Sequence, residues 1–310
     1  MKALRDVWAD TLVALAKEDQ RVVMLDGDLA NSTKADKFAA AHPDRFLEMG
    51  IAEQNMVGVA VGMAAVGFVP WLSTFTVFFT HRAIDPIRML VAQTNANVKI
   101  GAAYSGLMTG YTGKTHHDVE DLAIMRAMPG MTLLAPADQY ECAAMIKWAT
   151  EYEGPVYLRL TRDASADVFT ADYQFTLGEI RWLRRGEHAL LISTGPQSSR
   201  CFEAANELAK QQIELGVLHI PSIKPLNEAA LIDACSAYDL IFTVEEHSIF
   251  GGLGGLVAEL LSANSPRRVI RYGLEDKWGE SAPNDFLLDK YGLSALQVSR
   301  RIAADFQNKR

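Results

Sequence analysis

Short apolar runs alternate with longer amphipathic stretches along most of this chain, a pattern typical of parallel α/β architecture. Residues 4–16 carry apolar side chains at helical spacing, and a short apolar run follows at 22–25. Further helices are expected at 82–92, 119–127 and 139–151, and further strands at 45–49, 69–73, 98–104, 132–135 and 156–160. The first half of the chain therefore predicts one parallel sheet with helices around it.

The pattern turns polar and irregular over residues 163–187 and then resumes. After this interval, strands are expected at 189–193, 216–220 and 240–244, and helices at 199–211, 227–234 and 254–261, with one strand and two helices within 268–307. We therefore predict two doubly wound α/β domains, at residues 1–165 and 187–310, joined by a linker at 166–186.

The longest apolar run covers residues 57–69 and contains only apolar residues and glycine. Its thirteen residues are too few to span a bilayer. Gly58, Gly62 and Ala65 offer small surfaces for close packing, so we predict a helix that is buried on all sides. Residues 1–10 lack the apolar core of a signal peptide. A soluble protein without a membrane partner is expected.

The composition is that of a globular protein, with 49% hydrophobic and 22% charged residues among 310. A net charge of −8 argues against nucleic acid or an anionic membrane as the main partner. A phosphorylated substrate remains compatible with it, because a few local cations can outweigh the average. Three widely spaced cysteines without a CxxC pair suit a reducing compartment. We predict a cytoplasmic location.

Glu53 is a lone carboxylate in the segment GIAEQNM (50–56), directly before the apolar run. Poor solvation there favours the protonated form, and a partly protonated carboxyl can share a proton with a nitrogen base. An isolated glutamate at a helix start more often complements the helix dipole. Asp28, Phe75 and the 104–116 loop also follow predicted strands. In parallel sheets ligands gather at such strand ends, so we predict one shared site.

The segment GIAEQNM followed by a Gly/Ala-rich helix resembles the pyrimidine-binding domain of the transketolase family. Further similar segments are STFTVFF (73–79), YTGKTHHDVE (111–120) and, in the second half, TVEEHSIFGGLG (243–254). The resemblance covers nearly the whole chain. It implies a parallel-sheet thiamine pyrimidine-binding domain, a transketolase C-terminal-like domain with a mixed sheet, and thiamine diphosphate as the cofactor.

The same resemblance implies roles in cofactor binding. Glu53 would hydrogen-bond the aminopyrimidine nitrogen, and Phe75 and Phe78 would stack on the ring. Arg82 matches an arginine of the related deoxyxylulose-phosphate synthases, and Asp28 would lie near the cofactor at a subunit interface. Glu53 is therefore a candidate for both catalysis and cofactor binding.

Four residues are candidates for substrate contact by resemblance. His116 would contact the substrate and help to stabilise the developing oxyanion, which makes it the second catalytic candidate. Tyr104 stands where the family often has another substrate histidine, and the identity of the ketose is therefore open. Arg162 and Ser32 would contact the substrate phosphate. The family's other phosphate arginine, expected near the start of this domain, has no clear match.

The chain has no GDG motif, which the family uses to bind diphosphate and magnesium. We therefore expect no metal ligand on this chain and a Mg²⁺ site on a separate N-terminal transketolase subunit. An α2β2 heterotetramer with self-dimerisation is the expected assembly. The predicted function is transfer of a two-carbon ketol unit between sugar phosphates. Alternatives are a 2-oxo-acid dehydrogenase beta subunit, a deoxyxylulose-phosphate synthase-like enzyme and a non-catalytic assembly partner.

Overall fold

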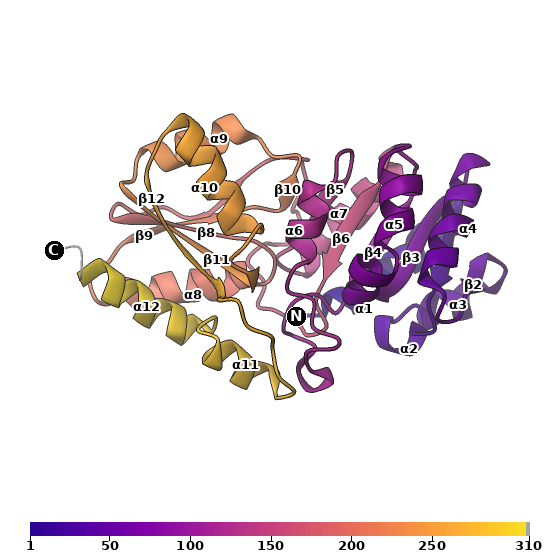
Figure 1. Ribbon diagram of the computed structural model, residues 1–310, viewed down its shortest axis with the longest axis horizontal. Coiled ribbons are helices and arrows are strands. Elements are labelled where there is room, and N and C mark those ends of the chain that lie inside the picture. Colours follow the sequence, from indigo (N-terminus) through magenta and orange to yellow (C-terminus); the bar gives the residue numbers. More distant parts are fainter. Residues whose placement is uncertain (308–310) are drawn as a thin grey trace.

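Seven strands form the sheet of the first unit in the computed structural model, which describes residues 1–307 (Figure 1). They are β1 (Val22–Asp26), β2 (Phe46–Glu48), β3 (Val69–Phe75), β4 (Lys99–Ala103), β5 (Thr132–Leu134), β6 (Val156–Leu160) and β10 (Ser222–Lys224). The strand order is β10-β5-β6-β4-β3-β1-β2, and only β10 runs antiparallel to its neighbour. Every residue of β1, β3, β4 and β6 is buried, as expected for a parallel sheet covered on both faces.

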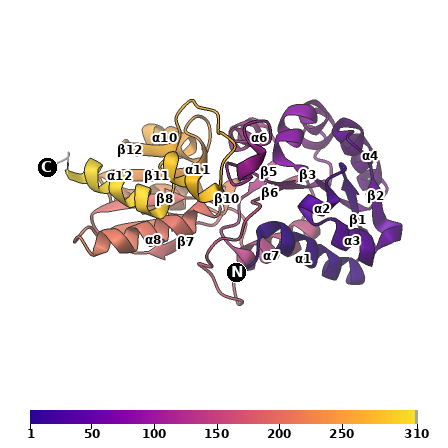
Figure 2. The ribbon, with the colours of Figure 1, turned by 90° about the horizontal axis from the view of Figure 1, so that it is seen from below.

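Helices cover this sheet on two faces (Figure 2). Trp8 and Leu12 pack with Met145 in one core cluster, whereas Met56 packs with Ile87 in another. The helices are α1 (Leu4–Glu18), α2 (Ala30–Thr33), α3 (Asp36–Ala41), α4 (Glu53–Ala65), α5 (Ile84–Pro86), α6 (Asp121–Ala127) and α7 (Gln139–Glu151), with the short helical segments η1 (Pro43–Arg45), η2 (Phe78–Arg82), η3 (Ile87–Ala92) and η4 (Gly110–Thr112).

The second unit has a five-stranded mixed sheet in the order β12-β11-β8-β9-β7, with β7 antiparallel to β9. Its strands are β7 (Arg181–Arg184), β8 (Ala189–Ser193), β9 (Leu215–His219), β11 (Leu240–Ser248) and β12 (Arg268–Leu274). Its helices are α8 (Gln197–Ala209), α9 (Glu228–Ser236), α10 (Leu253–Asn264), α11 (Asn284–Lys290) and α12 (Ala295–Gln307). The predicted pair of α/β domains, one parallel and one mixed, is confirmed.

Two short strands were not predicted. β7 lies inside the interval 166–186, where the polar pattern predicted only a linker. β10 comes from the second half of the chain but pairs with β5 in the first sheet. Both are edge strands of three or four residues, too short to show a clear period of two. The domain boundaries stay a prediction, since β10 joins the two halves.

The helix expected at 82–92 is also irregular. It consists of two π-helical segments, η2 and η3, with the short α5 between them. Pro86 lies in α5 and has no amide proton to donate, so a continuous ladder of helical hydrogen bonds cannot pass through it. Phe78 and Arg82 therefore stand on a π-helical turn directly after β3.

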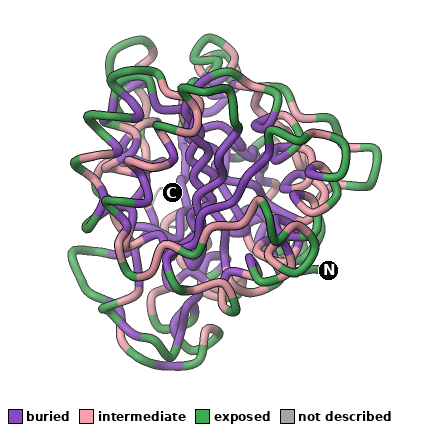
Figure 3. The backbone as a smooth tube through the Cα atoms, turned by 90° about the vertical axis from the view of Figure 1, so that its right-hand side faces the viewer, coloured by how far each residue is buried: buried purple, intermediate pink, exposed green. Residues whose placement is uncertain are grey.

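The prediction that α4 is buried on all sides is wrong. Met56, Val57 and Ala60 face the core, but Gly62, Ala65 and Val66 are exposed, Val66 by 74%. A Cβ atom added at Gly58 or Gly62 would meet nothing within 4 Å. Only one side of α4 packs against the sheet, so the small residues line an uncovered apolar face. Figure 3 shows that buried segments otherwise occupy the interior. Across residues 1–307, no helix combines the length and apolar character needed to cross a membrane.

Candidate active site

Three strand ends come together at the carboxyl edge of the first sheet. Asp26 of β1 pairs with Ser73 of β3, and Phe75 of β3 pairs with Ala103 of β4. Tyr104 follows Ala103 directly. The parallel register therefore places side chains from distant parts of the sequence at one edge, as predicted for a shared site.

Four candidate residues form an aromatic cluster at this edge. The Phe75 ring stacks on Tyr104 with centroids 4.0 Å apart and on Phe78 with centroids 5.8 Å apart. The His116 ring is steeply inclined to both phenylalanine rings, with its centroid 6.0 Å from that of Phe75 and 5.6 Å from that of Phe78. The structure thus brings the two predicted stacking residues, Phe75 and Phe78, together with two of the four predicted substrate residues, Tyr104 and His116.

Glu53 lies beside the cluster and is 4% exposed. Arg82 donates from Nη1 to Glu53 Oε1 at 2.8 Å, and its guanidinium carbon lies 3.9 Å from the Phe78 ring centroid. No hydrogen bond within residues 1–307 reaches Glu53 Oε2. Glu53 is therefore a buried carboxylate in an ion pair with a half-exposed arginine.

Tyr104 connects the cluster to two arginines. Its hydroxyl accepts a hydrogen bond from Arg5 Nη1 at 2.5 Å and donates to the Ser32 carbonyl at 3.3 Å, while Arg162 lies 5.6 Å from its ring centroid. The Nε atoms of Arg5 and Arg162 are buried and have no partner in the described chain. Tyr104 has a φ of +62°, which is rare for a bulky residue and marks local strain.

Sequence reasoning missed Arg5. Ninety-nine residues separate it from Tyr104, and nothing in its position on the first turn of α1 points to this contact. Ser32, a predicted substrate residue, also contacts Arg5, because Arg5 Nη1 donates to its backbone carbonyl at 2.7 Å. Arg5, Arg162 and the Ser32 backbone therefore all lie beside Tyr104, and Arg162 and Ser32 are the residues that were predicted to contact the substrate phosphate.

Asp28 stands apart from the cluster. It is exposed with a φ of +64°, its backbone amide donates to Glu48 Oε1, and no side-chain contact to the cluster is present in the described chain. The buried carboxyl at this strand end belongs to Asp26, which accepts from Ser73 Oγ at 2.5 Å. Burial raises the pKa of Asp26 to about 6. The sequence analysis selected Asp28 as the candidate at this strand end, two residues away from the buried carboxyl.

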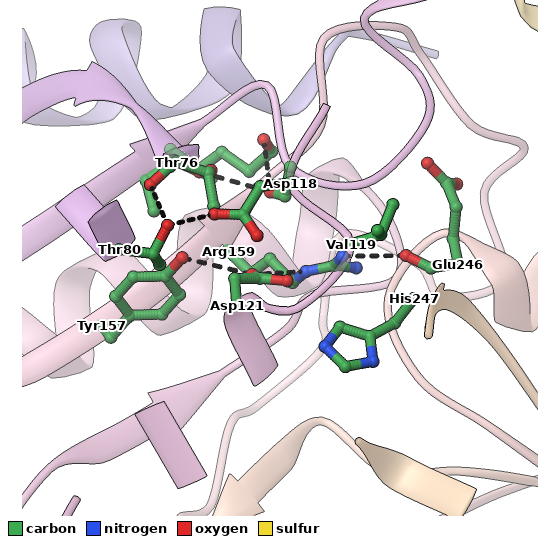
Figure 4. Close-up of polar contacts among 12 residues, drawn as sticks. Thr76, Thr80, Asp118, Val119, Asp121, Tyr157, Arg159, Glu246 and His247 are labelled. Atoms are coloured by element: carbon green, nitrogen blue, oxygen red, sulfur yellow. Dashed lines mark hydrogen bonds and ion pairs between the residues drawn. The ribbon is translucent and has the colours of Figure 1, made fainter. Parts of the chain in front are cut away.

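The loop that carries His116 ends in a buried polar network (Figure 4). The Asp118 carboxyl accepts from Thr80 Oγ1 of η2. Burial, followed by the charge of Asp121, raises the pKa of Asp118 to about 7. Burial, followed by the charge of Arg82, lowers the pKa of His116. Its Nδ1 bonds the Thr115 hydroxyl at 2.8 Å, and the described chain makes no hydrogen bond with its Nε2.

Models of two known protein families match the chain. The family described as "Transketolase, pyrimidine binding domain" matches residues 1–166, and that described as "Transketolase, C-terminal domain" matches residues 178–298. The chain belongs to the transketolase family. The resemblance inferred from residues 50–56 is therefore confirmed.

Individual relatives from this family match the chain over almost its whole length. The "Putative transketolase C-terminal section" of Methanocaldococcus jannaschii is 37% identical and covers 99% of this chain and 98% of the relative. The "6-deoxy-6-sulfo-D-fructose transketolase subunit SqwH" of a Clostridium species is 36% identical over 96% and 92%. A solved structure titled "Split gene transketolase, inactive beta4 tetramer" is 40% identical, covers 100% of both chains and superposes with a TM-score of 0.92.

The transketolase-family domains imply thiamine diphosphate dependence in the family. The residues at the cluster fit the pyrimidine end of that cofactor. The Arg82 guanidinium is a flat hydrogen-bond donor that lies on Phe78 and reaches Glu53, which are the two contacts that an aminopyrimidine needs. The free Oε2 of Glu53 and the half-buried Phe78 provide further contact surface.

The expectation that this chain carries no metal ligand stays a prediction. His81, Asp118 and Glu120 have potential ligand atoms within 4.8 Å of one another. The carboxyl of Asp118 is, however, already engaged by Thr80 and by the Glu120 amide. The adjacent His117 is buried, and its Nε2 bonds the Gly110 carbonyl at 3.3 Å.

Proposed function

We propose that this chain is the C-terminal subunit of a thiamine diphosphate-dependent transketolase that moves a two-carbon ketol unit from a ketose phosphate to an aldose phosphate. The observation that carries this proposal is that Glu53 and Phe78 hold a flat hydrogen-bond donor, the Arg82 guanidinium, between a carboxylate and an aromatic face. The chemistry that breaks and re-forms the carbon–carbon bond would be supplied by bound thiamine diphosphate.

The residues of this chain would bind, orient and exchange protons. The Glu53 carboxyl would hold the ring nitrogen, and Phe75 and Phe78 would fix the plane of the ring. His116 lies next to both rings and has a lowered pKa, so it is neutral at physiological pH. A neutral imidazole can donate a hydrogen bond to an oxyanion that develops on the substrate and can take a proton from a substrate hydroxyl.

The far end of the substrate would lie between Arg5 and Arg162. Both side chains are partly exposed, and the described chain makes no hydrogen bond with Nη2 of Arg5 or with either Nη atom of Arg162, so an oxyanion would pair with these donors. Phosphate and sulfonate groups share this chemistry. The Clostridium relative is named for a sulfonated sugar, which is compatible with either anion at this place.

A second polypeptide is part of the proposal. A separate N-terminal subunit would bring the diphosphate and Mg²⁺ site, and two copies of each chain would form the heterotetramer. The uncovered apolar face of α4 supports a contact with another chain, because such faces are rarely left to water. The relative titled as an inactive β4 tetramer supports self-association of this subunit type. A cytoplasmic location stays a prediction.

Relatives named as transketolase subunits favour this function over a 2-oxo-acid dehydrogenase beta subunit. A deoxyxylulose-phosphate synthase-like activity is the alternative with a specific observation behind it, since such a synthase of Heliobacterium modesticaldum is 33% identical over 95% of this chain, although the match covers only 46% of the synthase. Assays with hydroxypyruvate or xylulose 5-phosphate, run beside assays with pyruvate, separate these activities. A non-catalytic partner would be inactive in all of them.

The first test replaces Glu53 by alanine and by glutamine. In the enzyme reconstituted with its diphosphate-binding subunit, both variants should lose roughly a thousandfold in ketol transfer, or about 4 kcal/mol of barrier lowering. The loss follows because a methyl or an amide cannot share a proton with the ring nitrogen. Initial rates and the assembled mass are measured together. Wild-type rates in Glu53→Ala would rule out the cofactor assignment.

Two controls accompany this test. Glu18→Gln makes the same change on the exposed end of α1 and should leave the rate unaffected. The isolated wild-type chain should bind thiamine diphosphate weakly in calorimetry. Tight magnesium-dependent binding by this chain alone would contradict the two-subunit proposal.

A further inference from the structure

The loop that carries His116 is fixed at its end by the first α/β unit. The Gly106 amide donates to the Asp118 carbonyl at 2.8 Å and closes the neck of the loop. The Asp118 side chain accepts from Thr80 Oγ1, and Thr80 stands on the same π-helical turn as Phe78 (Figure 4). His116 is thereby tied to the ring that it faces.

The start of the same loop is held by the second unit. Glu246 of β11 is 2% exposed, and its Oε1 accepts from the Leu107 amide at 2.9 Å and from the Met108 amide at 3.0 Å. A Cβ atom at Gly106 would lie 2.5 Å from this oxygen, and Gly106 has a φ of +72°. Only glycine fits at position 106, and its lack of a side chain lets the loop backbone lie directly against the Glu246 carboxylate.

Groups from both units hold Glu246 itself in place. Arg200 donates to its Oε2 at 3.2 Å. Arg159 of β6 donates from Nη2 to its backbone carbonyl at 2.9 Å and forms a buried ion pair with Asp121 at 2.8 Å (Figure 4). The carboxylate therefore has two backbone donors on Oε1 and a charged donor on Oε2, and little freedom to move.

We infer that Glu246 is a positioning residue through which the second α/β unit sets the place of His116. Its effect on turnover rests on the proposed function, but its effect on the loop does not. This gives the second unit a part in the site, although none of its residues is a candidate for cofactor or substrate contact. Small displacements of a catalytic group cost much of its effect, so the anchor matters even without touching substrate.

Amide hydrogen exchange on the full chain tests the anchor directly. In Glu246→Ala, the amides of Leu107 and Met108 lose their acceptor, so exchange in the peptide that covers 105–112 should rise at least tenfold. Glu259→Gln is the matched control, because Glu259 also forms an ion pair across the two units, with Arg126, without touching the loop. It should leave this peptide unchanged. Wild-type protection in Glu246→Ala would overturn the inference.

Glu246→Gln decides the matter if the alanine variant does not fold. Glutamine keeps one oxygen acceptor but loses the charge that Arg200 and both amides contact, so exchange in the same peptide should rise about threefold. Protection equal to wild type in a folded Glu246→Gln would equally overturn the inference.

Turnover gives a second readout in the reconstituted two-chain enzyme. The kcat of Glu246→Gln should fall about tenfold, while the affinity for thiamine diphosphate changes less than twofold, because Glu53 and Phe75 stand on other elements. If Glu246 had a purely structural role, its substitution would lower kcat and the cofactor affinity together, or would change neither. If wild type lacks ketol transfer but the loop loses protection in the variant, the proposed function fails and the anchor stands. If wild type is active and kcat is unchanged in the variant, the anchor fails alone.

Discussion

The carboxyl ends of the strands carry polar side chains in both units, but the two sets are used differently. In the first unit, Arg5 and Arg162 keep buried Nε donors without partners in the described chain. In the second unit, Ser193 donates to Ser198 at 2.8 Å, and Ser198 bonds His219 Nδ1 at 2.7 Å. The first edge has free hydrogen-bonding capacity, whereas this part of the second edge is satisfied internally.

The second set even has the residue types of a nucleophilic triad. Ser198 contacts His219, and His219 Nε2 lies 2.8 Å from Glu141 Oε2. All three are fully buried, and Glu141 belongs to α7 of the first unit, so the group joins the two units where no substrate can reach it. The comparison teaches that residue types and distances do not identify a site without free donors and access.

The largest expected effect comes from breaking the contact between the two units that Ser198, His219 and Glu141 form. His219→Ala should lower the free energy of unfolding by about 3 kcal/mol, because it leaves a cavity and removes partners from two buried polar groups. Urea denaturation measures the change. His188→Ala is the control, since His188 is exposed and accepts one backbone hydrogen bond from Glu214, and it should cost less than ~1 kcal/mol.

The same variant sharpens the comparison by its activity. If Ser198, His219 and Glu141 only connect the two units, the folded His219→Ala enzyme retains the kcat of wild type at low temperature. A large loss of turnover with unchanged stability would mean that the second edge is a site after all.

A smaller effect is expected at Asp118, which lies between the two edges. Its pKa is raised from 3.8 to about 7 by burial and then by the charge of Asp121. Between these values the folded chain holds a proton that the unfolded chain has released, so stability falls as the pH rises through this window. Asp118→Asn removes that titration and keeps an acceptor for Thr80. Relative to wild type, it should gain about 2 kcal/mol between pH 5 and pH 8.

Denaturant unfolding at both pH values checks this prediction. Asp44→Asn makes the same substitution at an exposed position and serves as the control. A difference between Asp118→Asn and wild type that stays constant with pH would show that the buried carboxyl does not titrate in this window.

Much of this fold was predictable from the sequence, because long buried strands and amphipathic helices leave strong periodic patterns. β1, β3, β4 and β6 were predicted because each is rich in apolar residues, even though Lys99 lies in β4 and Arg159 in β6. An apolar run predicts a helix but does not show which of its sides are covered by the rest of the chain. For this reason α4 was wrongly expected to be buried on all sides. Edge strands such as β10 depend on pairing with distant residues and leave almost no local signal.

The site shows the same division. Glu53, Phe75, Phe78 and His116 were predicted because they stand in contiguous motifs, and the structure brings them together. Arg5 was missed because its partner Tyr104 is far away in sequence. Contacts made across the fold, unlike motifs, have no local spacing that a reader of the sequence could recognise.

The smallest expected effect concerns the free donors themselves. Arg162→Met keeps the packing volume of the side chain and removes its charge, so the KM for a phosphorylated acceptor should rise about tenfold, equivalent to about 1.4 kcal/mol. The KM for an unphosphorylated acceptor should change little. Steady-state assays of the reconstituted enzyme with both acceptors measure the ratio.

Arg181→Met is the control, because it makes the same substitution at an arginine of the second unit. Arg181 also lies over a tyrosine ring, 5.2 Å from the Tyr173 centroid, and also has a buried Nε without a partner in the described chain. It stands on β7, at the edge of the second sheet, away from the aromatic cluster. An equal loss in both variants would show that an orphaned guanidinium nitrogen does not mark a ligand. A loss confined to Arg162→Met would show that the free donor counts only where it faces the cluster, because there a substrate anion can reach it.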